Sequence, residues 1–164
     1  MDIPVSLTPM NIHTLTVRNR FVLPGMVTDM AVDGGYVTER LLSYYEERAK
    51  GGVGLVIVEA TSIDVSGKTF LHGLDISDDR FIPGLRLLTE RVHAHGAAVA
   101  IQLQHGGRAA LPQFSGHAVP LVSAIPGVTP YDNSAILSEE EIARLVECWG
   151  KAAVRAREAG FDAV

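Results

Sequence analysis

The stretch GLVIVEA at residues 54–60 is a nearly continuous apolar run with the β-branched residues Val56, Ile57 and Val58 at its centre. A second run of this kind, AAVAIQL, occupies residues 97–103. Uninterrupted apolar strands are typical of parallel sheets, because helices cover such sheets and bury both sides of each strand. The two runs therefore predict buried parallel strands and favour the α/β class.

Segments with helical periodicity separate the predicted strands. Residues 38–50 and 80–95 each place apolar side chains on one face, and glycine follows each segment at the expected stop. A third helix opens at Ser138 and Glu141, which form a capping-box pattern, and ends at Gly160. The chain therefore alternates strand and helix.

Strands are predicted to begin near residues 20, 54, 97 and 161, with a helix in every gap. We expect one domain over residues 1–164, built from about four parallel strands with intervening helices. A small hairpin is predicted where residues 15–17 pair with the chain near Ile12. Residues 104–137 are predicted to form a loop, and loops of this length are usually functional or disordered.

Two architectures fit this alternation: an open doubly wound sheet and a (β/α)8 TIM barrel. A dinucleotide-binding sheet would carry a glycine-rich loop directly after its first strand. Here the first strand runs into Pro24-Gly25-Met26-Val27, and the glycine cluster at 51–54 precedes a strand instead. The barrel is favoured, although four strands cannot close one, so we expect its N-terminal half.

Composition limits the classes of partner. The net charge of -5 gives no electrostatic reason to expect binding to nucleic acid or to an anionic membrane. Cys148 is the single cysteine, which excludes an internal disulfide. Neither a signal peptide nor a spanning segment is visible, so a cytoplasmic location is expected.

Small and polar residues gather where the predicted strands end. Because the carboxyl ends of parallel strands meet at one edge, these residues are expected to form a binding rim. They are Pro24, Gly25, Met26, Val27 and Thr28 after the first strand, Glu59 and Ala60 at the second, and Gln102, His105 and Arg108 at the third.

Each of these residues also has a structural interpretation. Gly25 could serve only a turn, and Glu59 could pair with an arginine of a neighbouring strand. Gln102 lies in an apolar strand, where a buried amide would need hydrogen-bond partners. His105 and Arg108 could form an anion or substrate site or a capped loop. No metal site is expected, because the remaining histidines lack ligand spacing.

Four segments resemble the old yellow enzyme family of FMN-dependent ene-reductases, and the subgroup near 2,4-dienoyl-CoA reductase and 2-enoate reductase is the most similar. They are NRFVLPGM at 19–26, YEERAKGGVGLVIVEA at 45–60, IQLQHGGR at 101–108 and AREAGFDAV at 156–164. The resemblance implies a TIM barrel with FMN at its carboxyl-terminal mouth. It also implies a relay of hydride from NADH or NADPH through the flavin to an activated alkene.

The resemblance also assigns roles to residues. Pro24, Gly25 and Met26 would line the isoalloxazine ring, Ala60 would lie against it, and Gln102 would bind its pyrimidine edge. Val27 stands where relatives often have a hydrogen-bonding threonine or cysteine, a bond that valine cannot make unless Thr28 substitutes. Thr28, His105 and Arg108 are the candidates on the substrate side.

In the family, the substrate-carbonyl ligands, the proton donor and the phosphate-binding loops come later in the chain than the part that this sequence resembles. We therefore name no catalytic residue. The expectation is an N-terminal half-barrel, cut at the start of its fourth strand and inactive without the C-terminal half. The alternative is a non-catalytic assembly module, completed by a partner chain or by self-association.

Overall fold

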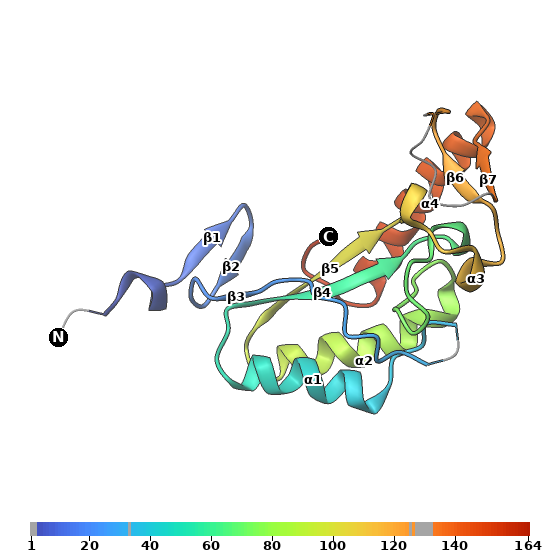
Figure 1. The fold of residues 1–164 in the computed structure, drawn as a ribbon. Helices are drawn as coiled ribbons and strands as arrows, with labels where there is room; N and C mark the ends of the chain where they lie inside the picture. The colour runs from blue at the N-terminus through green and yellow to red at the C-terminus, as the bar shows by residue number, and fades with distance from the viewer. Residues whose placement is uncertain (1–2, 33, 125, 127–132) are drawn as a thin grey trace.

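The computed structural model describes residues 3–32, 34–124, 126 and 133–164. At its centre is a parallel three-stranded sheet with the strand order β3-β4-β5. Helix α1 lies between β3 and β4 in the chain, α2 between β4 and β5, and α4 follows β5 (Figure 1). The bounds are β3 (Val22–Leu23), α1 (Glu39–Lys50), β4 (Leu55–Ser62), α2 (Ile82–His93), β5 (Ala98–Gln104) and α4 (Glu139–Glu158). The predicted βα alternation is confirmed.

The helices begin where their capping residues predict. The Thr38 hydroxyl accepts a hydrogen bond from Leu41 N at the start of α1. Asp78 caps a short 3-10 helix, η3 (Asp79–Phe81), that leads into α2. At α4 both halves of the capping box form: Ser138 Oγ accepts from Glu141 N, and Glu141 Oε2 accepts from Ser138 N at 2.7 Å. These bonds satisfy amide groups that have no partner within the helix.

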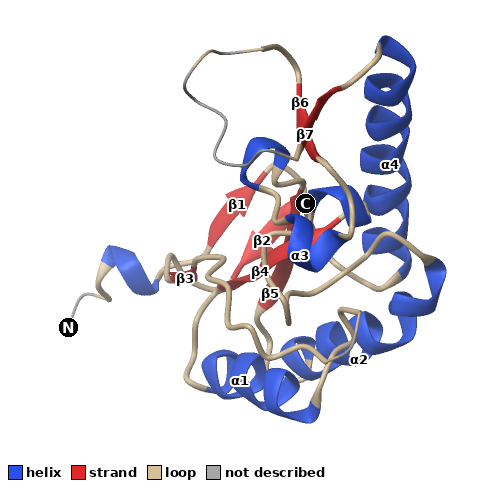
Figure 2. Cartoon of the chain, turned by 45° about the vertical axis from the view of Figure 1, so that its right-hand side comes forward, coloured by secondary structure: helices blue, strands red, loops and turns tan. Residues whose placement is uncertain are grey.

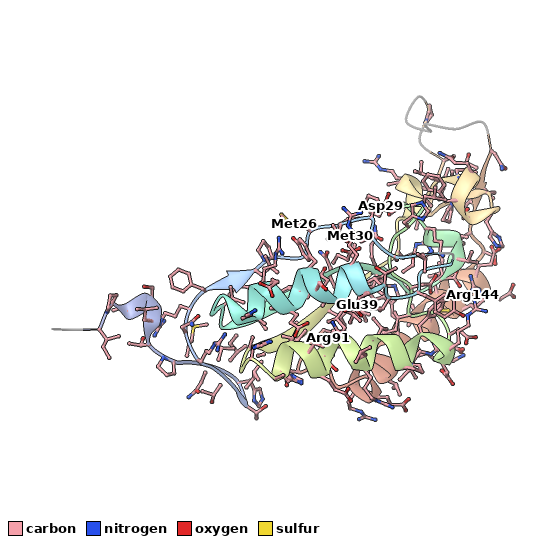
Figure 3. The ribbon with its side chains drawn as sticks, turned by 90° about the horizontal axis from the view of Figure 1, so that it is seen from below. Met26, Asp29, Met30, Glu39, Arg91 and Arg144 are labelled. Atoms are coloured by element: carbon pink, nitrogen blue, oxygen red, sulfur yellow. The ribbon has the colours of Figure 1, made fainter. Side chains whose placement is uncertain are left out.

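One face of the sheet carries the main hydrophobic core. Figure 1 shows α1 and α2 on the same side of the sheet, and both pack against its strands. Arg91 of α2 joins the two helices through bonds of 2.6 and 2.9 Å to the Glu39 carboxylate of α1 (Figure 3). The core includes Leu41, Tyr45, Val56, Val58, Leu85, Leu88, Val92, Val99, Ile101, Ala152 and Ala156.

The predicted N-terminal hairpin is confirmed and lies on the other face of the sheet. A short 3-10 helix, η1 (Val5–Leu7), leads into strands β1 (Met10–Ile12) and β2 (Leu15–Val17), which pair antiparallel. Val17 packs there with Leu55 and Ala100 in a second buried cluster. Leu55 and Ala98 are paired near the amino ends of β4 and β5, so the hairpin covers the sheet toward that end.

Arg18, directly after β2, closes the amino end of the sheet. Its guanidinium donates to three backbone carbonyls: Ala49 O at 2.8 Å, Val53 O at 2.9 and 3.1 Å, and His95 O at 2.6 Å. Two of these carbonyls lie where α1 and α2 end. A cation at a helix C-terminus satisfies free carbonyls and interacts favourably with the helix dipole.

The predicted fourth strand is present only as a single bridge. Ala163 pairs in parallel with Ala100, and Ile101 N donates to Ala163 O at 3.2 Å. The Asp162 side chain accepts from Val99 N at 2.8 Å. The segment is therefore anchored at the free edge of β5 by a side chain and one bridge, without a continuous ladder over residues 161–164.

The prediction of a plain loop over residues 104–137 was wrong in part. The segment contains η4 (Gly107–Ala109), the short helix α3 (Pro112–Ser115) and two strands, β6 (Val119–Leu121) and β7 (Ser134–Ile136), which pair in parallel. Residues 125 and 127–132 of this segment lie outside the described residues. Strands of three residues are too short to show a periodic pattern. Figure 2 shows this pair beyond the ends of β4 and β5, beside α4.

Within the described residues, no helix combines the length and the apolar character that a membrane span requires.

Candidate functional site

The carboxyl ends of the three central strands bring predicted rim residues together. Ala60 of β4 is paired with Gln102 of β5. Gly25, after β3, lies so close to Gln102 that a Cβ atom at position 25 would be 2.9 Å from Gln102 Oε1 and 3.3 Å from Val58 O. Glycine at this position therefore serves a close approach between two segments, and not a turn alone.

A β-bulge at Glu59 shapes this rim. The register shifts between Val58 and Ala60, which pair with the consecutive residues Ile101 and Gln102. Glu59 is therefore the extra residue, and a bulge of this kind redirects a side chain. The Glu59 side chain is fully buried, whereas Gln102 is exposed. The expectation that Gln102 is a buried amide was wrong, because its side chain lies on the uncovered part of the sheet.

The residues of the loop after β3 differ in their exposure to solvent. Pro24 is exposed, Met26 is 56% exposed, and Val27 is half-buried. Figure 3 shows Met26 in the segment that also carries Asp29 and Met30. Thr28 N donates to Glu59 Oε2 at 2.9 Å, and Thr28 Oγ1 is buried and has no hydrogen-bond partner within the described part of the chain. In this conformation the Thr28 hydroxyl is not accessible from solvent.

Glu59 pairs with a tyrosine and a backbone amide, and the predicted arginine pair is wrong. Tyr45 of α1 donates to Glu59 Oε2 at 3.2 Å and accepts from Glu59 N at 2.9 Å. Burial raises the pKa of the Glu59 carboxyl, although its Thr28 and Tyr45 donors oppose this effect. Burial and the nearby Glu59 also raise the pKa of the Tyr45 hydroxyl well above its usual range.

His105 belongs to a second polar group, which links the loops after β4 and β5. Its Nδ1 accepts from Gly107 N at 3.1 Å, so its Nε2 is the donor toward Ser66 Oγ at 3.2 Å. Ser66 Oγ in turn donates to Asp64 Oδ1. Burial lowers the pKa of His105, which favours the neutral imidazole. The His105 side chain therefore holds two loops together.

Asp64 connects this group to α4. Arg144 donates to Asp64 Oδ2 at 2.6 Å, and Figure 3 labels Arg144 on its helix. Burial opposes ionisation, but the bonds from Arg144 and Ser66 outweigh it and lower the pKa of Asp64 to about 2. Asp64 also caps the 3-10 helix η2 (Val65–Gly67). The Asp-Val-Ser pattern at 64–66 was the available sequence signal for this role, and sequence reasoning missed it.

Arg108 does not share the surroundings of His105. It is exposed on η4, while the His105 ring is half-buried against Ser66. The structure therefore brings Gly25, Ala60 and Gln102 together at the rim, places Met26 beside them in the chain, and assigns Thr28 and His105 to hydrogen bonds that hold loops.

This fold matches the N-terminal part of flavin-dependent TIM-barrel oxidoreductases. The chain belongs to the NADH:flavin oxidoreductase / NADH oxidase family, whose model matches residues 7–164. The family uses FMN with NADH or NADPH. The resemblance that the motifs indicated is confirmed, and the βα units described above correspond to the N-terminal half of the family's TIM barrel.

Three relatives illustrate the match. A metal reductase of Desulforamulus reducens is 39% identical over 98% of this chain and 24% of its own length. An NADPH dehydrogenase of Halalkalibacterium halodurans is 38% identical over 92% of this chain and 44% of its own length. The structure of the old yellow enzyme homologue from Zymomonas mobilis superposes with a TM-score of 0.88 at 31% identity. The match covers 97% of this chain and 47% of that protein. The chain thus spans about a quarter to a half of the length of these proteins.

Proposed function

We propose that this chain forms the FMN-binding part of an oxidoreductase that takes hydride from NADH or NADPH and reduces an activated alkene. The observation that carries the proposal is the rim at the carboxyl ends of β3, β4 and β5, where Gly25, Ala60 and Gln102 meet. In TIM-barrel enzymes the active site lies at this end of the strands.

The residues of this rim fit a flat heterocycle. Gly25 lets the loop approach Gln102 closely, Ala60 presents only a methyl group, and the exposed Gln102 amide offers both a donor and an acceptor. The exposed thioether of Met26 and the ring of Pro24 supply apolar, adaptable contact. When bound, FMN supplies the hydride-transfer chemistry. The chain's own residues orient its ring and exclude water from one side.

Val27 offers no side-chain hydrogen bond to a group at the rim, and the Thr28 hydroxyl is buried. We therefore infer that neither side chain replaces the threonine or cysteine of other family members. Backbone groups of residues 25–27 take that role, because the Thr28 amide is already bound to Glu59.

Three residues were predicted on the substrate side. Arg108 is the one whose charge is exposed, so we propose it for an anionic part of the substrate or cofactor. His105 and Thr28 take part in hydrogen bonds that hold loops, and we propose that they shape the site without binding substrate.

We propose the C-terminal half of the barrel as the partner that supplies phosphate anchoring and the proton donor. The test joins this chain to the part of the Halalkalibacterium halodurans NADPH dehydrogenase that it does not cover. FMN content and reduction of 2-cyclohexenone are then measured for the chimera and for the chain alone.

We expect flavin in the chimera and loss of most of it in a Gln102→Leu variant, with Gln113→Leu, an exposed glutamine on α3, as the control. A folded chimera that binds no FMN would contradict the proposal. If the chain alone also formed a defined oligomer, the non-catalytic assembly module would be favoured.

A further inference from the structure

Glu59 is a fully buried carboxyl without a cationic partner among the described residues. Its Oε2 atom accepts two hydrogen bonds, from Thr28 N and from the Tyr45 hydroxyl. A carboxylate in the interior is costly unless it is paired or fully hydrogen-bonded. The arrangement around Glu59 therefore needs an explanation beyond packing.

Two polar atoms of this arrangement are buried without a hydrogen-bond partner among the described residues. They are Glu59 Oε1 and Thr28 Oγ1, which belong to residues already joined through Thr28 N. An ionised Glu59 would bury a negative charge with no cation to balance it and with no donor to Oε1. A neutral carboxylic acid with the same contacts avoids most of that cost. The geometry thus favours a proton on Glu59.

The groups that face Glu59 agree with this state. Tyr45 from α1 is an uncharged donor, and Thr28 is uncharged. The negative charge of Asp29 adds to burial in raising the pKa of Glu59. Among the described residues, no cation lies within ion-pair distance of Glu59.

Glu59 also connects the end of β4 to the loop after β3. It is the bulged residue between Val58 and Ala60, and it binds the amide of Thr28 at the end of the loop that begins at Pro24. Near its other end, this loop is packed through Gly25 against Gln102. The loop over residues 25–28 is therefore held against the sheet near both of its ends.

We propose that Glu59 is a positioning residue: as a neutral carboxylic acid it binds the Thr28 amide and fixes the loop over residues 25–28 against the end of β4. The inference rests on the proposed function only in its consequence, which is that this loop is preorganised for FMN. The Tyr45 hydroxyl of α1 orients the carboxyl through its hydrogen bond to Glu59 Oε2.

The test compares wild type with the Glu59→Gln and Glu59→Ala variants, each made in the full-length protein. A glutamine keeps an acceptor for Thr28 N and presents a donor in place of Oε1, as a neutral acid does. Thr89→Val is the matched control, because Thr89 is also buried and donates to Ala159 O at 2.6 Å, away from the rim.

The first readout is hydrogen–deuterium exchange at the amides of residues 25–28 without FMN. We expect exchange to rise about tenfold in Glu59→Ala and to stay near wild type in Glu59→Gln and Thr89→Val. The second readout is the FMN dissociation constant. It is expected to rise in Glu59→Ala and to stay near the wild-type value in Glu59→Gln and Thr89→Val.

A third readout uses only variants that fold. The infrared spectrum of wild type minus that of Glu59→Gln at pH 7 should contain the carbonyl band of a protonated carboxyl. A carboxylate band alone, or a Glu59→Gln variant as mobile as Glu59→Ala, would overturn the neutral acid. Equal exchange in Glu59→Ala and wild type would overturn the positioning role. If wild type bound no FMN, the proposed function would fail, while the exchange experiment would still decide the role of Glu59.

Discussion

The two ends of the central sheet are each held by an arginine, but with different partners. At the amino end, Arg18 donates to three backbone carbonyls. At the carboxyl end, Arg144 donates to the Asp64 carboxylate, which is linked to Ser66 and His105. The first arrangement contains no titratable acceptor, whereas the second is built from titratable groups. The hydrogen bonds of Arg18 therefore do not depend on the titration of an acceptor, whereas the contacts of Arg144 depend on the ionisation of Asp64.

The largest effect is expected from removing the arginine at the amino end. An Arg18→Met variant leaves three partly buried carbonyls without their donor and should lower the free energy of unfolding by about 3–4 kcal/mol. Arg20→Met, at an exposed position nearby, is the control and should cost less than about 0.5 kcal/mol. Urea unfolding measures both. Similar losses in the two variants would show that Arg18 does not close this end of the sheet.

The carboxyl end should respond to pH. The pKa of Asp64 is lowered from 3.8 to about 2, so its ionised form stabilises the fold above about pH 4, and this contribution is lost as the pH falls toward 2. The difference in unfolding free energy between wild type and Asp64→Asn should be up to about 2 kcal/mol at neutral pH. It should shrink below pH 4. A difference that stays constant down to pH 2 would contradict the ion pair with Arg144.

A substitution at the rim should change FMN affinity more than it changes the free energy of unfolding. A Gly25→Ala variant places a methyl group against the flexible end of Gln102, so it should weaken FMN binding about tenfold, or about 1.4 kcal/mol. The free energy of unfolding should change by less than about 1 kcal/mol. Flavin fluorescence titration and urea unfolding together test this prediction. Loss of stability without loss of affinity would place Gly25 among the structural residues.

The smallest effect is expected on α4, away from both ends. Gly150 lies inside this helix, and a Cβ atom there would meet nothing within 4 Å. Gly150→Ala should therefore raise the free energy of unfolding by about 0.5–1 kcal/mol, because alanine loses less backbone entropy in a helix. FMN affinity should not change. A decrease in thermal stability would indicate that the space around Gly150 is needed.

The parts of the site that could be predicted from the sequence are those that depend on local patterns. Apolar strands followed by Pro24-Gly25 and by Gln102 predicted both the sheet and the edge where its residues meet. The capping box at Ser138 predicted where α4 begins. In each case, a few neighbouring residues contain the physical cause.

The remaining features join segments that lie far apart in the chain. Asp64 and Arg144 are 80 residues apart, and Thr28 and Glu59 are 31 apart. The bulge that buries Glu59 and leaves Gln102 exposed depends on how two strands pair, which no single strand specifies. Sequence by itself determined the α/β class, the order of the three central strands and their helices, and the family. Only the tertiary structure decided which polar side chains face the rim and which are buried behind it, because that choice depends on register and long-range packing.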